Sequence, residues 1–130
     1  MDRQEIRNVV DERSAEWEDF DGQKKELVTD FAVEILEYAK KQGIEFDHSA
    51  GITFVSHLTT LYQRMFITGE EIEIEESLLD QITPELMEMS EGTGEIVMKY
   101  FGKKLNPGEI FLIATHLGSM QERIRQGVVD

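Results

Sequence analysis

The sequence has no cysteine, two prolines and one tryptophan among its 130 residues. Without cysteine the chain has no disulfide framework and no thiolate chemistry. No apolar run approaches the roughly 18 residues that a membrane-spanning helix needs. The polar start, Met1-Asp2-Arg3-Gln4-Glu5, also lacks the apolar stretch of a signal peptide. We therefore expect a cytoplasmic protein that is not inserted in a membrane.

Basic residues are scarce as well. Thirteen Lys and Arg stand against 27 Asp and Glu, so the formal net charge is -14. Nucleic-acid binding relies on clustered Lys and Arg, and we therefore expect no direct contact with nucleic acid. A basic protein partner, or solubility alone, suits this charge better. The motifs P-loop, GxGxxG, HExxH and GxSxG are all missing, so we predict no cofactor, no metal site and no catalytic residue.

The apolar residues that are present recur at helical spacing, which predicts an all-α fold. An acidic amphipathic helix is expected over residues 1–20, followed by a turn at Asp21-Gly22. Further helices are expected over residues 23–42 and 49–68, with a short one at 77–80. The acidic residues 70–76 between them are expected to form a solvated loop.

Two helices are marked by their N-terminal residues. Thr83 and Pro84 favour a helix start, although Gly92 and Gly94 weaken that helix and favour a kink or a split near Thr93. The last helix opens at Asn106-Pro107-Gly108-Glu109, which has the spacing of a capping box. The expected architecture is a bundle of about five helices joined by short loops.

The chain has three histidines, and two of them differ from the third. His48 lies in a polar connector and is expected to be exposed, whereas His57 and His116 lie in amphipathic helices at the edge of the apolar stripe. Arg64 follows His57 by seven residues and Glu109 precedes His116 by seven, so each shares a helix face with its histidine. The alternatives are structural histidines, an Arg64 paired at the surface with Glu70 or Glu71, and a Glu109 that only caps its helix.

Two stretches resemble the histidine motifs of PTS regulation domains (PRDs). The first, residues 56–69, has a His, apolar positions, an Arg seven residues on and then a Gly; the second, residues 105–117, has a Glu that opens a helix and an apolar run that leads into a His. The resemblance covers about residues 22–126. It implies a helical domain of two antiparallel helix pairs, which usually dimerises and whose histidines accept phosphate from the phosphocarrier HPr or a sugar-specific transport component.

On this resemblance we expect His57 and His116 to be phosphorylated, with Arg64 and Glu109 facing or supporting the phosphate. One copy of the motif pair and no recognisable nucleic-acid module indicate a stand-alone single-domain member, with residues 22–130 as the domain and 1–21 as an acidic N-terminal helical extension. The family often has an acidic residue where this chain has Ser56. Two other readings stay open: a helical adaptor that is not phosphorylated, and a small enzyme or metal protein using His57, His116 and Glu109.

Overall fold

The computed structural model describes residues 1–129, and every regular element in that range is helical. The helices are α1 (Arg3–Arg13), α2 (Gly22–Lys41), α3 (His48–Gln63), α4 (Glu76–Leu79), α5 (Pro84–Phe101) and α6 (Pro107–Gln126), with a π-helical turn η1 (Arg64–Thr68) continuing α3. The predicted all-α class is confirmed. None of these helices combines the length and the apolar character that crossing a bilayer requires.

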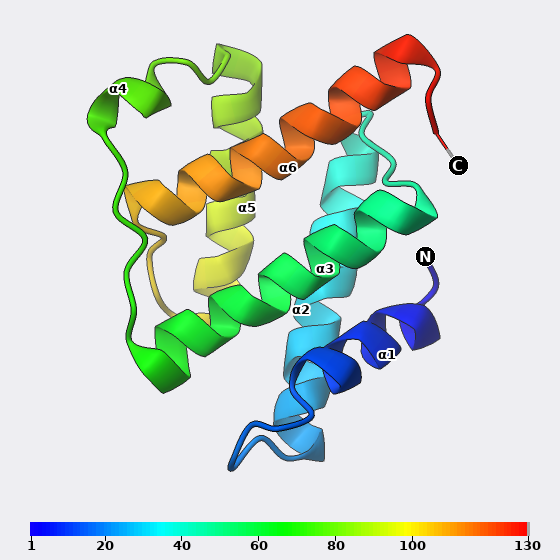
Figure 1. Cartoon of the computed structure of the whole chain (residues 1–130), viewed down its shortest axis with the longest axis vertical. Coiled ribbons are helices and arrows are strands. Elements are labelled where there is room, and N and C mark those ends of the chain that lie inside the picture. The colour runs from blue at the N-terminus through cyan, green and yellow to red at the C-terminus, as the bar shows by residue number, and fades with distance from the viewer. Residues whose placement is uncertain (130) are drawn as a thin grey trace.

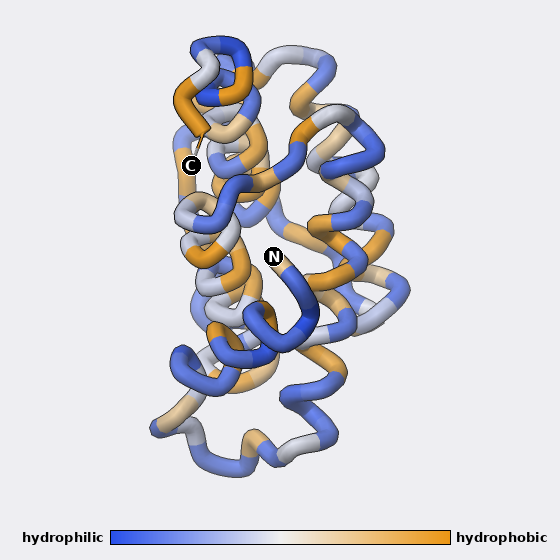
Figure 2. The backbone as a smooth tube through the Cα atoms, turned by 90° about the vertical axis from the view of Figure 1, so that its right-hand side faces the viewer, coloured by the Kyte–Doolittle hydropathy of each residue, from blue (hydrophilic) through white to orange (hydrophobic). Residues whose placement is uncertain are grey.

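Four long helices form two antiparallel pairs, as Figure 1 shows. One pair is α2 with α5, and the other is α3 with α6, which crosses the first pair obliquely. Each helix places its apolar stripe in one shared core, while hydrophilic stretches alternate with hydrophobic ones along the chain (Figure 2). The most deeply buried large side chains are Phe31, Phe54, Ile35, Leu58, Leu61, Ile113 and Leu117.

Helix α1 packs against α2 and α3 through Ile6 and Val10, which are both buried. Its start is fixed by a capping box in which the Asp2 carboxylate accepts from the Glu5 N–H and the Glu5 carboxylate accepts from the Asp2 N–H. The predicted helix over residues 1–20 is wrong beyond Arg13. Ser14 ends the helix because its buried hydroxyl donates to the Val10 carbonyl and its backbone leaves the helical region.

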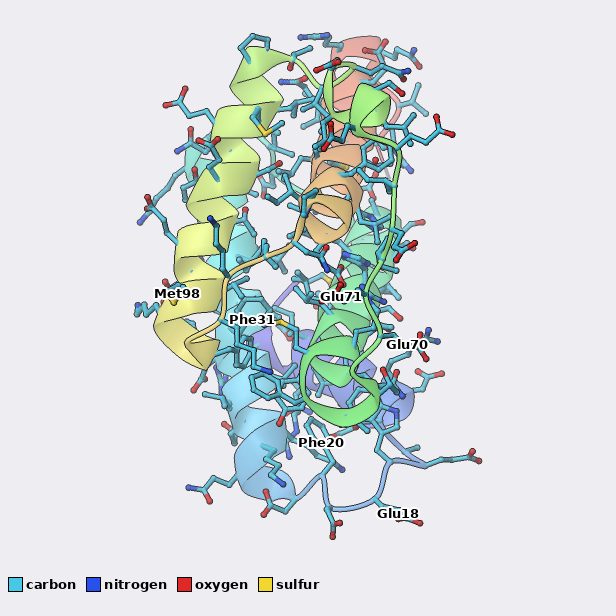
Figure 3. All side chains as sticks on the ribbon, turned by 90° about the vertical axis from the view of Figure 1, so that its left-hand side faces the viewer. Glu18, Phe20, Phe31, Glu70, Glu71 and Met98 are labelled. Atoms are coloured by element: carbon cyan, nitrogen blue, oxygen red, sulfur yellow. The ribbon has the colours of Figure 1, made fainter. Side chains whose placement is uncertain are left out.

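The residues between α1 and α2 form turns that still supply apolar contacts to the core. Trp17 and Phe20 meet edge to face, with ring centroids 5.0 Å apart, and Phe20 also contacts Tyr62 of α3. In Figure 3 the Glu18 side chain points away from the body of the protein, whereas Phe20 lies below the helices that it packs against. The apolar residues of this segment continue the helical spacing, but they contact the core from a backbone that is not helical. The spacing therefore predicted a helix that is too long.

Helix α5 is continuous from Pro84 to Phe101, so the predicted split near Thr93 is absent. The contacts of two neighbouring residues, Gly92 and Thr93, account for the unbroken helix. A Cβ on Gly92 would lie 2.0 Å from the hydroxyl oxygen of Tyr38, so the glycine lets α2 and α5 approach closely. The buried Thr93 hydroxyl donates to the Met89 carbonyl one turn back and so needs no partner outside the helix.

The connection from α3 to α4 begins with the π-helical turn η1 and ends as an extended, mostly acidic segment. Gly69 terminates the turn with φ of +69°, a conformation that glycine adopts without strain. Residues 70–75, called the acidic linker below, then cross the first turn of α6. The carbonyl oxygen of Ile72 would lie 2.0 Å from a Cβ on Gly108, so the linker and α6 meet backbone to backbone.

Candidate functional site

His57 and His116 face each other across the contact between α3 and α6. Their ring centroids are 4.7 Å apart and the ring planes are inclined by 34°. His57 lies in the middle of α3 and His116 in the middle of α6, and the packing of these two helices brings the two rings together. We call this contact the histidine seam. The two histidines at the edges of the apolar stripes thus lie in contact with each other.

The imidazole of His57 is held as a neutral base. Burial lowers its pKa most, and the neighbouring His116 and Arg64 lower it further, to about 3. Its Nε2 is buried and is the one such side-chain nitrogen or oxygen within residues 1–129 that lacks a hydrogen-bond partner. A buried polar atom without a partner is unusual in a folded protein, and a functional role is one explanation for it.

His116 is also uncharged at neutral pH, because burial lowers its pKa. Its ring packs against Phe54, with centroids 5.2 Å apart, and Phe54 in turn stacks on Phe46 with nearly parallel rings. This aromatic row holds the ring of His116 from one side while His57 lies against it from another. Both imidazoles thus keep a free lone pair at pH 7, which is the state a nucleophilic nitrogen requires.

Arg64 and Glu109 form a second contact between the same two helices. The Arg64 Nε donates to Oε2 of Glu109 at 2.7 Å and an Nη donates to Oε1 at 2.8 Å, which is a two-bonded pairing. Glu109 is buried and Arg64 is partly buried, with 4% and 11% of their side-chain surface exposed. The alternative that Arg64 pairs with Glu70 or Glu71 at the surface is therefore wrong.

The capping box expected at the start of α6 forms only in part. The Asn106 side chain accepts from the Glu109 N–H as predicted, but both carboxylate oxygens of Glu109 accept from Arg64. Glu109 is consequently more than a cap, since it joins α6 to the end of α3. The positive charge of Arg64 is compensated by Glu109 within the fold.

A third contact, which the sequence analysis missed, joins the other ends of the two helices. Asp47 caps α3 by accepting from the Ala50 N–H, and its second oxygen accepts from Arg123 of α6 at 2.6 Å. The Asp47 side chain is 3% exposed. An Asp directly before a helix could be identified as an N-cap from sequence. Its partner 76 residues away could not.

The histidine seam therefore has an ion pair at each end. Arg64 of η1 follows His57 by seven residues, and Glu109 precedes His116 by seven in α6, so each member of the Arg64–Glu109 pair lies about 10 Å along the axis from its histidine. Every charge also suits its helix end, with Asp47 and Glu109 at N-termini and Arg64 and Arg123 at C-termini. Both ion pairs therefore stabilise the antiparallel packing of α3 against α6.

His48 and the carboxylate of Glu109 both lie apart from the contact of His57 with His116. His48 is exposed, and its Nδ1 lies 3.1 Å from a carboxylate oxygen of Glu5, away from the seam. Glu109 is bound to Arg64 and does not join the two histidines as a third ligand. Across the part of the chain that the structure describes, no three His, Cys, Asp or Glu side chains are grouped to hold a metal ion.

Comparison with known families matches residues 33–127 to the PRD domain. The chain belongs to the PRD family. It is thus a PTS regulation domain, and the matched region contains both histidines of the seam and both members of the Arg64–Glu109 pair. No match was found among curated proteins or among solved structures. Helix α1 lies outside the matched region, and the division into an extension over 1–21 and a domain over 22–130 stays a prediction.

Proposed function

We propose that this PRD is a regulatory module whose His57 and His116 accept phosphoryl groups from HPr or from a sugar-specific transport component. The observation that carries the proposal is the pairing of two neutral imidazoles on facing helices, with ring centroids 4.7 Å apart, within the residues that match the family. Neither ring needs to lose a proton before it can attack phosphorus at neutral pH. His48 has no place in this arrangement.

The transfer balances without a cofactor. A ring nitrogen of the acceptor gives its lone pair to phosphorus while the P–N bond of the donor phosphohistidine breaks. The electron pair of that bond returns to the donor imidazole, which leaves as a neutral ring because its other nitrogen carries a proton. The acceptor becomes a phosphorylated imidazolium and then releases the proton of its second nitrogen to water. The donor is already reactive, so the domain contributes a positioned nucleophile.

The phosphoryl group changes the charge of the seam. It adds between one and two negative charges to a chain whose formal charge is already -14. The cation nearest to His57 along its helix face, Arg64, is engaged by Glu109, so a phosphate competes with Glu109 for it. We propose that this competition alters the packing of α3 against α6 and, through it, a homodimer or a partner surface.

The test is the intact mass of the protein after incubation with enzyme I, HPr and phosphoenolpyruvate. We expect a gain of phosphoryl mass that acid removes, in the wild type and in His48→Ala. The double variant His57→Ala, His116→Ala should gain none. If the wild type takes up no phosphate from active donors, or if the double variant still does, the proposal is wrong and the adaptor reading replaces it.

A further inference from the structure

Helix α1, which lies outside the family-matched residues 33–127, reaches the same helix that carries His57. Figure 1 shows α3 between α6 on one side and α1 on the other. The last residue of α1, Arg13, donates from Nε to the hydroxyl of Thr60 in α3 at 3.2 Å. Thr60 follows His57 by three residues, so their side chains are neighbours on the surface of α3, with about 5 to 6 Å between the Cβ atoms. The end of α1 therefore brings a guanidinium to a residue one helical turn from His57.

The backbone that carries Arg13 is fixed by its neighbours on both sides. Val10, one turn earlier in α1, is fully buried, and Ser14, which follows directly, is buried and donates its hydroxyl to the Val10 carbonyl. The Thr60 hydroxyl that accepts from Arg13 donates in turn to the Ser56 carbonyl, so it is oriented as well. These bonds direct the side chain of Arg13 onto the surface of α3.

Arg13 is also a cation without a carboxylate partner. Every other arginine within residues 1–129 forms an ion pair with an Asp or Glu side chain, and Arg13 forms none. This is notable in a chain with 27 acidic and 13 basic residues. Helix α3, on which Arg13 lies, contains no Lys, Arg, Asp or Glu. Since Nε makes its one hydrogen bond in the described chain, the four N–H groups of its terminal nitrogens are left to bind an anion.

We propose that Arg13 binds the phosphoryl group on His57, so that α1 completes the phosphate site from outside the family-matched residues. The inference rests on the proposed function, which supplies that group. A guanidinium pairs with phosphate oxygens through two parallel hydrogen bonds. Arg64 must break two bonds to Glu109 before it can pair in this way, whereas Arg13 gives up at most one bond to a neutral hydroxyl. Binding by Arg13 therefore loses fewer bonds than binding by Arg64.

The contact links the modification of His57 to the packing of α1. In the unmodified chain the end of α1 is joined to α3 by the Arg13–Thr60 hydrogen bond. Bonds from a guanidinium to a phosphate join two charged groups and are stronger than a bond to a neutral hydroxyl. A phosphoryl group on His57 should therefore fix α1 more firmly on α3. His116 lies on α6, on the side of α3 away from α1, and has no such contact (Figure 1).

The test compares phosphorylated His57 with and without Arg13, in full chains that carry His48→Ala and His116→Ala, so that His57 is the one histidine left. Two donors are used: HPr with enzyme I and phosphoenolpyruvate, and phosphoramidate, which transfers its phosphoryl group to imidazole with release of ammonia. Phosphorus NMR across pH then gives the pKa for the last ionisation of the phosphoryl group. We expect this pKa to be lower by about 0.5 with Arg13 than with Arg13→Gln, because a neighbouring cation favours the dianion.

A matched control removes the same charge from the same helix. Arg7 pairs with Asp11 and Glu26, so Arg7→Gln should leave the phosphoryl pKa at the value seen with Arg13 and Arg7 both present. Arg13→Lys keeps the charge and should recover about half of the difference or more, although it lacks the planar fork. Circular dichroism checks that each chain is folded, and His116→Gln replaces His116→Ala where the latter is not.

Each outcome decides either the inference or the proposed function. The inference is overturned if Arg13→Gln leaves the phosphoryl pKa unchanged, if Arg7→Gln changes it as much, if Arg13→Lys recovers none of the difference, or if neither donor phosphorylates His57. An Arg13-dependent pKa after labelling with phosphoramidate, together with no transfer from HPr, would contradict the proposed function and support the inference. Transfer from HPr with a pKa that does not depend on Arg13 would support the function and contradict the inference.

Discussion

Arg64 of η1 and Glu109 of α6 form a largely buried, two-bonded ion pair about two helical turns from the paired histidines. Taken as a surface residue, Arg64 would be expected to contribute little to stability. Burial reverses that expectation, because removing one partner leaves the other charge without compensation in the core. The pair therefore stabilises the fold as well as lying beside the candidate site.

We predict that Arg64→Ala lowers the free energy of unfolding by about 3 to 5 kcal/mol, because Glu109 is left buried and unpaired. The double variant Arg64→Met, Glu109→Leu should be more stable than Arg64→Ala, since it removes both charges. Urea unfolding followed by circular dichroism measures both. The control is Arg3→Ala, which breaks an exposed pairing with Glu26 and Asp30 and should have a much smaller effect. Equal losses of stability in Arg64→Ala and Arg3→Ala would show that burial of the Arg64–Glu109 pair does not increase its contribution to stability.

The two glycines in the middle of α5 should respond in opposite ways to alanine. A Cβ on Gly94 makes an ordinary contact of 3.7 Å with Leu105, so Gly94→Ala should gain up to about 1 kcal/mol from helix propensity. A Cβ on Gly92 meets the Tyr38 hydroxyl at 2.0 Å, so Tyr38 must leave its position between α2 and α5. We expect Gly92→Ala to be less stable than Gly94→Ala by about 1 to 3 kcal/mol, measured as thermal or urea unfolding. The reverse order would mean that Tyr38 does not hold these helices together.

Much of this architecture follows from local sequence. The helix expected over residues 23–42 and the Thr83 and Asn106 caps depend on neighbours within a turn or two, and all lie within one residue of the predicted positions. The proximity of the histidines was also predictable, because both border stripes that must pack in one core. Features that depend on distant partners were not. The Asp47–Arg123 pair spans 76 residues, and the Arg64–Glu109 pair spans 45.

The errors have the same origin. Trp17 and Phe20 continue the apolar spacing of α1, but the buried Ser14 hydroxyl bonds back to Val10 and the chain leaves the helix. Their burial comes from Phe20 packing on Tyr62, a contact that no local pattern contains. The π-helical turn at Arg64–Thr68 likewise has no residue that marks it, because the same residues read as a continuation of α3.

Gly108 allows the acidic linker to cross the first turn of α6, and a side chain there should displace it. In Gly108→Ala the new Cβ would meet the backbone carbonyl of Ile72, which cannot rotate away as a side chain would. We expect a loss of about 1 to 3 kcal/mol in stability. Glutamyl endopeptidase should also cut the linker faster, since it contains Glu70, Glu71, Glu73 and Glu75. Gly22→Ala, where the added Cβ meets nothing within 4 Å, is the control. Unchanged cleavage in Gly108→Ala would contradict the close crossing.

Stability should fall in mild acid because of the histidine seam. The pKa of His57 is about 3 in the folded protein against 6.5 for an ordinary histidine, and burial lowers the pKa of His116 in the same direction. Between these values the unfolded chain binds more protons than the folded one, so stability rises with pH there. The stability that the neutral histidines contribute is fully present above about pH 6.5 and is lost as the pH falls from 6.5 toward 3. At pH 5, His57 alone should account for a loss of about 2 kcal/mol in stability, or about 1.36 kcal/mol for each pH unit below 6.5.

Urea unfolding of the wild type and of His57→Leu at pH 7 and pH 5 tests this, with His48→Ala as the control for removing a histidine outside the seam. His57→Leu should lose less stability between the two pH values than the wild type does. If the two proteins lose the same amount, His57 is not the buried neutral base that the seam requires.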